Sequence, residues 1–303
     1  MNDYTKRSFR LNDISQLEYE LAYTSPDFEN IVISHILGNY VKNSPFPLYL
    51  AIHGPKGEGK TFQTLRTCVK YGIAIYYISG AELCGSYEKD SIISIEKNLD
   101  DAICNYREKR TLSVFIIDDF HLSIASVDAG VSKTVNSQIL TGWLMNLADR
   151  AKAGSSSRIP FIFLGNDFVN LYPPLTRDGR MDFYEWKPSK EIKEKIICRH
   201  FEDYITKKEQ TEKFLGLISM YVDQPVSFFA ELKKDLLKNL ISKRIVEMDI
   251  KDPVNLLNGL NGISEEMLMD ESFDMVSQLS NLAKSRKKQS DAKMTLHEDR
   301  GNL

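Results

Sequence analysis

The chain has 303 residues, of which 27% are charged and 42% are hydrophobic, and its formal net charge is −3; this composition is ordinary for a globular protein with a large core and a smaller second domain. A charge so near to balance excludes a general attraction to nucleic acid, and no apolar run approaches the roughly 20 residues that a membrane-spanning helix requires. The 4 cysteines are widely spaced, which excludes a Cys-x-x-Cys zinc site and a disulfide framework and favours the cytoplasm as the location.

The N-terminal region combines a polar stretch with one predicted helix. Residues 1–24 are mostly polar and are expected to form an N-terminal extension. Residues 26–42 carry apolar side chains at helical spacing, which predicts a helix there. We expect this helix to open the main domain of the chain, which would cover residues 25–187.

Strands and helices alternate through the rest of this domain. Alternation of this kind is typical of a parallel sheet that is covered by helices on both faces, so the expected fold class is α/β. Strands are predicted at residues 49–52, 74–78, 113–117 and 161–164, and helices at residues 61–71, 91–109 and 134–150.

The composition changes after Pro188. No strand-like run follows directly, and apolar residues recur at helical spacing. We therefore expect residues 188–282 to form a small helical lid domain. Residues 283–303 contain the basic cluster 284–288 and end in polar residues, which predicts a flexible tail.

A complete phosphate-binding motif lies between the first predicted strand and the next helix, where it reads Gly-Pro-Lys-Gly-Glu-Gly-Lys-Thr over residues 54–61. Glycines allow backbone N–H groups to turn inward around a polyphosphate. Lys60 is expected to reach the β- and γ-phosphates, and Thr61 to hold Mg²⁺ through its hydroxyl. The alternative is a glycine-rich turn with a solvated lysine. The expected nucleotide-binding residues here are Gly54, Pro55, Lys56, Gly57, Glu58, Gly59, Lys60, Thr61 and Phe62.

Two carboxylates follow the strand predicted at residues 113–117. Ligands gather at the carboxyl ends of parallel strands, so Asp118 is expected to bind the nucleotide's Mg²⁺ together with Thr61. Asp119 is expected to polarise the attacking water, although it is one methylene shorter than the glutamate that is common at this position. The alternative is a pair of acidic residues that only opens a turn.

Asn166 follows the strand predicted at residues 161–164. Since parallel strands end at the same edge of a sheet, Asn166 is expected to lie beside the ends of the strands predicted at residues 49–52 and 113–117, where its amide would orient water against the γ-phosphate. The alternative is an Asx turn in which the amide bonds only its own loop.

Two arginines, Arg177 and Arg180, flank Asp178 and Gly179 in a predicted exposed turn. A planar guanidinium is suited to neutralising the charge on a transferring phosphoryl group. Nothing in the nucleotide site of the same subunit explains why two arginines lie in this turn, whereas the nucleotide bound by a neighbouring subunit would. The alternative is a surface salt bridge to Asp178 or Asp182.

Taken in order, these segments resemble an AAA+ ATPase, and more narrowly the Rubisco activase family. The resemblance runs from about Phe28 to Leu232 and is most specific over residues 165–168 and 171–181. It implies a P-loop NTPase core with Walker A and Walker B motifs, a helical lid, ATP and Mg²⁺ as cofactors, and hydrolysis of ATP to ADP and phosphate. It also implies a homo-oligomeric ring, usually a hexamer, whose pore remodels a protein client; in the family this is Rubisco, which is freed of inhibitory sugar phosphates.

The resemblance also assigns roles to residues. Asn166 would be sensor 1, Arg177 and Arg180 would be arginine fingers, and residues 83–87 and 126–130 would match the pore loops. The expected catalytic residues are Asp119, Asn166, Arg177 and Arg180.

The chain also departs from the family's pattern. The family generally has a sensor-2 arginine where this chain has Lys233, Lys234 and Asp235, so Lys233 would contact the nucleotide with a point charge. His121 stands where the family tends to have an acidic residue.

These departures leave other functions open. One alternative is an AAA+ assembly that acts on nucleic acid, but the basic residues between 233 and 244 are interrupted by Asp235 and lack interleaved aromatic residues. Another is a nucleotide-gated scaffold with little turnover, which Asp119 and the missing arginine favour. We expect a protein client, Rubisco or another target, and neither nucleic acid nor a membrane as partner.

Overall fold

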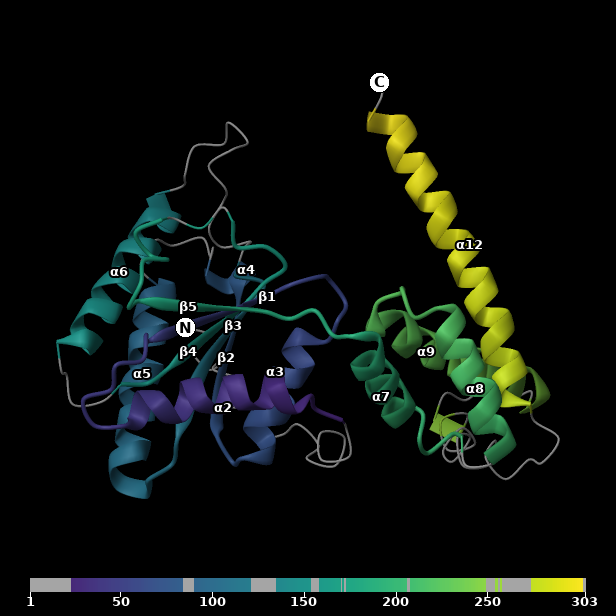
Figure 1. The fold of residues 1–303 in the computed structure, drawn as a ribbon, viewed down its shortest axis with the longest axis horizontal. Coiled ribbons are helices and arrows are strands. Elements are labelled where there is room, and N and C mark those ends of the chain that lie inside the picture. The colour runs from purple at the N-terminus through teal and green to yellow at the C-terminus, as the bar shows by residue number, and fades with distance from the viewer. Residues whose placement is uncertain are drawn as a thin grey trace. The chain divides into compact units, whose positions relative to one another are not determined.

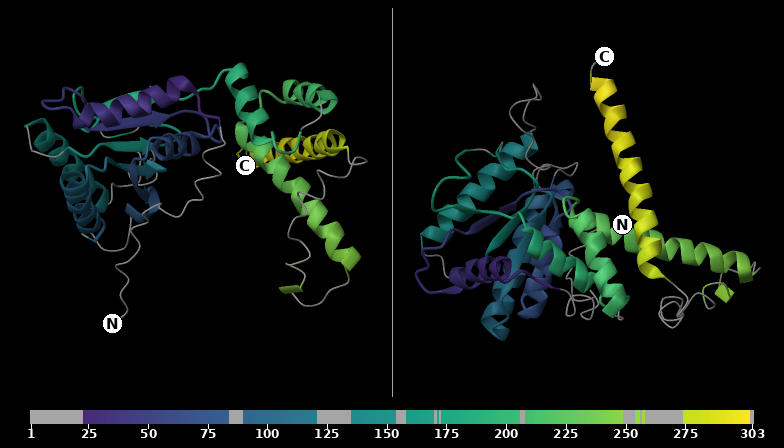
Figure 2. Two further views of the ribbon diagram at one scale, coloured as in Figure 1. Left: turned by 90° about the horizontal axis from the view of Figure 1, so that it is seen from below. Right: turned by 45° about the vertical axis from the view of Figure 1, so that its right-hand side comes forward.

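The chain divides into two compact units, Met1–Pro188 and Ser189–Leu303, which are described one at a time. The predicted N-terminal extension up to residue 22, the pore-loop candidates except Leu83, and His121 lie outside the described residues. The computed structural model describes residues 23–83, 90–120, 135–153, 158–169, 171, 173–205, 208–248, 254–255, 257 and 274–301 (Figures 1 and 2).

The first unit is built on a five-stranded parallel sheet with the strand order β2-β3-β4-β1-β5. This architecture confirms the expected α/β fold class. Each of the four predicted strands is present, with an end that is moved by at most one residue. The strands are β1 (Tyr49–His53), β2 (Ala74–Ser79), β3 (Ser113–Asp118), β4 (Phe161–Leu164) and β5 (Met181–Glu185).

Strand β5 was not predicted from the sequence. It pairs with β1 along its whole length, from Tyr49 opposite Met181 to His53 opposite Glu185. It lies at the edge of the sheet, and only Met181 of its five residues is buried. An edge strand with so little buried surface lacks the apolar run that marks the central strands.

Both faces of the sheet are buried, as the continuous apolar sequences of the central strands require. Helices α5 and α6 cover one face, where the rings of Tyr76, Phe115 and Phe161 stack across three strands with centroids 4.9 and 4.7 Å apart. Helix α2 lies against α3 and buries Phe28 and Val32. The helices are α2 (Pro26–Tyr40), α3 (Lys60–Lys70), α4 (Gly80–Leu83), α5 (Asp90–Lys109) and α6 (Val135–Lys152).

The second unit is helical and has its own core, to which Phe201, Phe214, Phe229 and Leu279 contribute fully buried side chains. Its first helix begins at Lys190 and is preceded by Ser189, whose hydroxyl accepts a hydrogen bond from the backbone N–H of Ile192 as the N-cap. None of the described helices combines the length and hydropathy that a membrane crossing demands. The main helices are α7 (Lys190–His200), α8 (Lys208–Met220), α9 (Val226–Met248) and α12 (Met275–Gly301).

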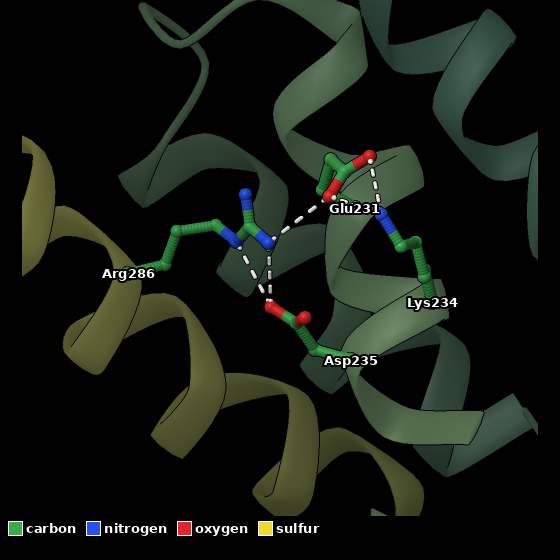
Figure 3. A network of polar contacts seen from close by, with 4 residues as sticks. All are labelled: Glu231, Lys234, Asp235 and Arg286. Atoms are coloured by element: carbon green, nitrogen blue, oxygen red, sulfur yellow. Dashed lines mark hydrogen bonds and ion pairs between the residues drawn. The ribbon is translucent and has the colours of Figure 1, made fainter. Parts of the chain in front are cut away.

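The structure corrects the predicted boundary between the lid and a flexible tail at residue 283, because helix α12 runs through it. Ala283 is fully buried in the second core. Arg286, in the basic cluster, donates to Asp235 Oδ2 on α9 from Nε at 3.0 Å and from Nη2 at 2.8 Å, and also pairs with Glu231 (Figure 3). The many polar residues of this segment obscured an apolar stripe at helical spacing that packs on α9.

The two interpretations of residue 283 differ in a measurable way. We expect Ala283→Asp to lower the free energy of unfolding of the second unit by about 3 kcal/mol or more, because it places an unpaired carboxylate in the core. Ser285→Asp, on the exposed side of the same helix, is the matched control and should change little. Urea unfolding followed by circular dichroism measures both. Equal stabilities would show that this segment does not pack as described.

Candidate active site

The loop between β1 and α3 has the backbone conformation that its glycines predict. Gly54, Gly57 and Gly59 have φ angles of 139°, 81° and 81°, a region that residues with a Cβ rarely adopt. At Gly54 a Cβ would also lie 2.2 Å from the carbonyl oxygen of Trp186, so no side chain fits there. The positive φ angles of its glycines and the close approach of Trp186 to Gly54 therefore both restrict the conformation of the loop.

Trp186 follows β5 and fixes the loop from the side. Its indole Nε1 donates to the carbonyl oxygen of Glu58 at 2.8 Å, and its backbone N–H donates to that of His53 at 2.7 Å. The ring is buried and packs edge-on against Phe28, with centroids 4.8 Å apart. Sequence reasoning missed Trp186 because it also missed the strand that brings it here.

Lys60 and Asn166, which are 106 residues apart, meet at this loop. Lys60 Nζ donates to the carbonyl oxygens of Gly54 at 2.8 Å and Pro55 at 2.9 Å, and to Asn166 Oδ1 at 3.2 Å. Burial lowers the pKa of Lys60, and the nearby carboxylate of Asp118 opposes this shift. The ammonium group of Lys60 and the amide of Asn166 thus lie together at the carboxyl ends of β1 and β4.

The carboxylate of Asp118 receives hydrogen bonds from three residues. Its Oδ2 accepts from Thr61 Oγ1 at 2.9 Å and from the Tyr77 hydroxyl at 2.7 Å, and its Oδ1 accepts from the N–H of Asp119 at 2.9 Å. Burial and the bond to Asp118 raise the pKa of Tyr77, so its hydroxyl stays protonated and donates. Sequence reasoning paired Thr61 with Asp118 but missed Tyr77.

The donor set around Asp118 fits a magnesium ion. Thr61 turns its hydroxyl hydrogen toward Asp118, which leaves oxygen lone pairs for a cation. A hydroxyl and a carboxylate are hard oxygen ligands of the kind that Mg²⁺ prefers. These two residues are therefore able to hold the ion that accompanies a nucleoside triphosphate.

Asp119 has a left-handed backbone with a φ of 51°, which aspartate tolerates better than most residues. Its side chain is exposed at the carboxyl edge of the sheet. Gly80, at the end of β2, approaches so closely that a Cβ there would lie 2.3 Å from the Asp119 carbonyl oxygen. The close approach of Gly80 thus restricts the conformation of the turn after β3. The carboxylate of Asp119 in this turn faces outward.

The two arginines of the turn after β4 differ in their surroundings. Arg180 forms a two-pronged ion pair with Asp149 of α6, with N–O distances of 2.9 and 2.7 Å, and its Nη1 donates to the carbonyl oxygen of Pro174. Asp149 raises the pKa of Arg180, which in turn lowers that of Asp149. The predicted alternative partners, Asp178 and Asp182, do not pair with it.

Arg177, by contrast, is exposed. Among the residues that the structure describes, no carboxylate lies within ion-pair distance of its guanidinium. The Arg180–Asp149 pair holds the loop that carries Arg177, so the two arginines are not equivalent.

The remaining predicted site residues are less telling. Pro55, Lys56 and Phe62 are exposed, with Phe62 at 38%. Lys233 belongs to the second unit, where its Nζ donates to the carbonyl oxygen of His200 at 3.2 Å and lies 4.3 Å from the Tyr204 ring centroid.

Comparison with known proteins gives a consistent result. Residues 50–189 match the family described as "ATPase family associated with various cellular activities (AAA)". The chain is 32% identical over 243 residues to the ribulose bisphosphate carboxylase/oxygenase activase of Nostoc sp., covering 76% of this chain and 55% of that protein. It is 30% identical over 246 residues to the chloroplastic activase of Chlamydomonas reinhardtii, covering 75% and 58%. The chain thus spans little more than half the length of these curated relatives.

The contact between Trp186 and the loop can be tested by nucleotide affinity. Trp186→Phe keeps a buried ring but removes the donor to Glu58, and a lost hydrogen bond of about 1 kcal/mol should weaken ATP binding roughly fivefold. Isothermal titration calorimetry measures this change.

Trp143→Phe is the matched control, since its indole also donates one hydrogen bond, to Glu96 Oε1 at 2.9 Å, but on α6. It should leave the affinity unchanged. A Trp186→Phe protein that binds ATP as tightly as the wild type would show that this hydrogen bond does not contribute to ATP binding.

Proposed function

This chain belongs to the AAA family of ATPases and is related to the Rubisco activases, and on that premise we propose that it hydrolyses ATP in order to remodel a protein client. The observation that carries the proposal is the hydrogen bond of Thr61 to Asp118, next to the contact of Lys60 with Asn166. These contacts join three separate motifs at one edge of the sheet. Such an arrangement supports phosphoryl transfer to water.

Each residue has a defined task in the proposed reaction. Lys60 exchanges its carbonyl partners for the β- and γ-phosphates, and Thr61 and Asp118 hold Mg²⁺, which neutralises charge on the phosphates when bound. Asn166 orients the attacking water through its amide, and Asp119 accepts hydrogen bonds from it.

We further propose that the site is completed by a neighbouring copy of the chain in a homo-oligomeric ring, for which a hexamer is the expected size. Among the described residues Arg177 has no carboxylate partner, and an exposed guanidinium of this kind is suited to act on another subunit's γ-phosphate. Arg180 supports it by fixing the loop against Asp149. We assign Arg177 as the arginine finger and Arg180 as its positioning residue.

The client is proposed from the relatives. Rubisco is the client that their activase names suggest. Another protein target is the alternative client, and the cytoplasm is the proposed location. In the second unit, Lys233 is proposed to contact the nucleotide in place of a sensor-2 arginine.

The nucleotide site is tested first by Lys60→Ala. We expect this change to abolish detectable ATP binding, because it removes the ammonium group that the loop encloses. Lys70→Ala, at the end of the same helix, removes a pair with Glu29 and a contact with the Tyr71 ring, both away from the loop, and should bind ATP normally. Fluorescence anisotropy of a labelled ATP measures both. Normal binding by Lys60→Ala would refute the site.

The shared site is tested by separating binding from turnover. Arg177→Ala should bind ATP and melt as the wild type does but hydrolyse it at least about 100-fold more slowly, because a finger acts on charge in the transition state. Arg180→Ala should also lower the melting temperature, since it breaks the pair with Asp149.

Mixing Arg177→Ala with Asp119→Asn subunits should restore part of the activity, because some interfaces then combine an intact carboxylate with an intact arginine. Full turnover by Arg177→Ala alone would remove this residue from the finger role. Absence of any restoration would count against sites shared between subunits.

A further inference from the structure

Tyr77 belongs to β2, a strand that carries none of the site's sequence motifs, and its side chain contacts the candidate metal site. The register of β2 and β3 places Ser79 opposite Asp118, and side chains two residues apart along a strand share a face. Tyr77 and Asp118 therefore point to the same side of the sheet. There the phenol hydroxyl donates to the same carboxylate oxygen that accepts from Thr61 Oγ1.

We propose that Tyr77 is a positioning residue for magnesium, which acts through Asp118 by holding its carboxylate in the orientation that binds the ion together with Thr61. This inference rests on the proposed function, because it assigns a role within the site for ATP and its metal.

The three donors to Asp118 differ in what they can fix. Thr61 is itself a candidate metal ligand, and the N–H of Asp119 belongs to the turn that follows the strand. Tyr77 lies within a strand that is paired with β3 along its length, so its hydroxyl is the donor with the most rigid support. Groups that hydrogen-bond a metal-binding carboxylate typically change metal affinity or activity by about 10- to 100-fold when they are removed.

A second contact independently joins the end of β2 to the metal site. Gly80, three residues after Tyr77, approaches the backbone of residues 118 and 119 so closely that a Cβ would lie 2.3 Å from the Asp119 carbonyl oxygen and 3.0 Å from that of Asp118. The strand that provides the phenol is therefore fitted against the turn that carries both carboxylates.

The same strand offers a matched comparison. A half-buried tyrosine hydroxyl needs some hydrogen-bond partner, so a structural role must be separated from a positioning role. Tyr76 also donates to an aspartate, Asp101 Oδ2 of α5, at 2.8 Å. The two bonds have the same chemistry and nearly the same length, but Tyr76 faces the core that α5 and α6 cover.

The experiment compares wild type, Tyr77→Phe and Tyr76→Phe as full chains, and follows the affinity of a fluorescent ATP analogue across a magnesium titration and in EDTA. We expect Tyr77→Phe to need about tenfold more magnesium than the wild type for the half-maximal gain in affinity. Its affinity in EDTA should be unchanged, and Tyr76→Phe should match the wild type throughout. An unmoved magnesium midpoint in Tyr77→Phe, or equal shifts in the two variants, would overturn the proposal.

A double-mutant cycle tests whether Tyr77 acts through Asp118. In an Asp118→Asn background, Tyr77→Phe should cause no further loss of magnesium-dependent affinity, whereas independent effects would add. Should Tyr77→Phe melt early in EDTA, Tyr77→Met must still show the shifted midpoint, and a normal midpoint in it would contradict the inference. A wild type whose ATP affinity gains nothing from magnesium would instead refute the proposed function, so the two failures are distinguishable.

Discussion

Three hydrogen bonds converge on the carboxylate of Asp118, and they arrive from the first turn of α3, from β2 and from the turn after β3. A carboxylate at the end of a buried strand is costly unless such donors surround it, so the three elements must keep their relative positions for the site to exist. This requirement links the position of the phosphate-binding loop, which precedes α3, to the carboxyl end of β3. It also gives β2, which carries none of the sequence motifs, a direct contact with the carboxylate of Asp118.

Two close backbone approaches set the remaining geometry. Gly54 lies against the carbonyl of Trp186, and Gly80 lies against the turn of Asp119; in both places a Cβ would come within 2.3 Å of a backbone oxygen. The first approach joins the phosphate loop to β5, and the second joins the acidic turn to β2. Because β5 begins directly after the loop of Arg177 and is followed by Trp186, one short strand connects the proposed finger to the phosphate loop of the same subunit.

The features that the sequence predicts well are local ones. Residues 54–61 form a contiguous motif between a strand and a helix, and buried parallel strands appear as apolar runs, so the phosphate-binding loop and the central strands could be predicted directly. The contact of Thr61 with Asp118 is distant in the chain and could be expected only because each residue belongs to a motif. The missed features depend on partners that are distant in the chain. Tyr77 and Trp186 become informative only when strand register and the edge strand are known, and the polar sequence of α12 does not reveal that α9 covers it.

The Arg180–Asp149 pair is another feature that the sequence alone does not reveal. Both arginines of the turn have the same sequence context, and only the fold distinguishes the one that is paired from the one that is exposed. This asymmetry supports a site that a second copy of the chain completes.

The most direct test of that account is ATP hydrolysis across a series of protein concentrations, with the oligomer mass recorded in the same samples. If a neighbouring subunit completes the site, the rate per subunit rises steeply as oligomers form and then levels off. A rate per subunit that does not change between monomer and oligomer would contradict a site shared between subunits.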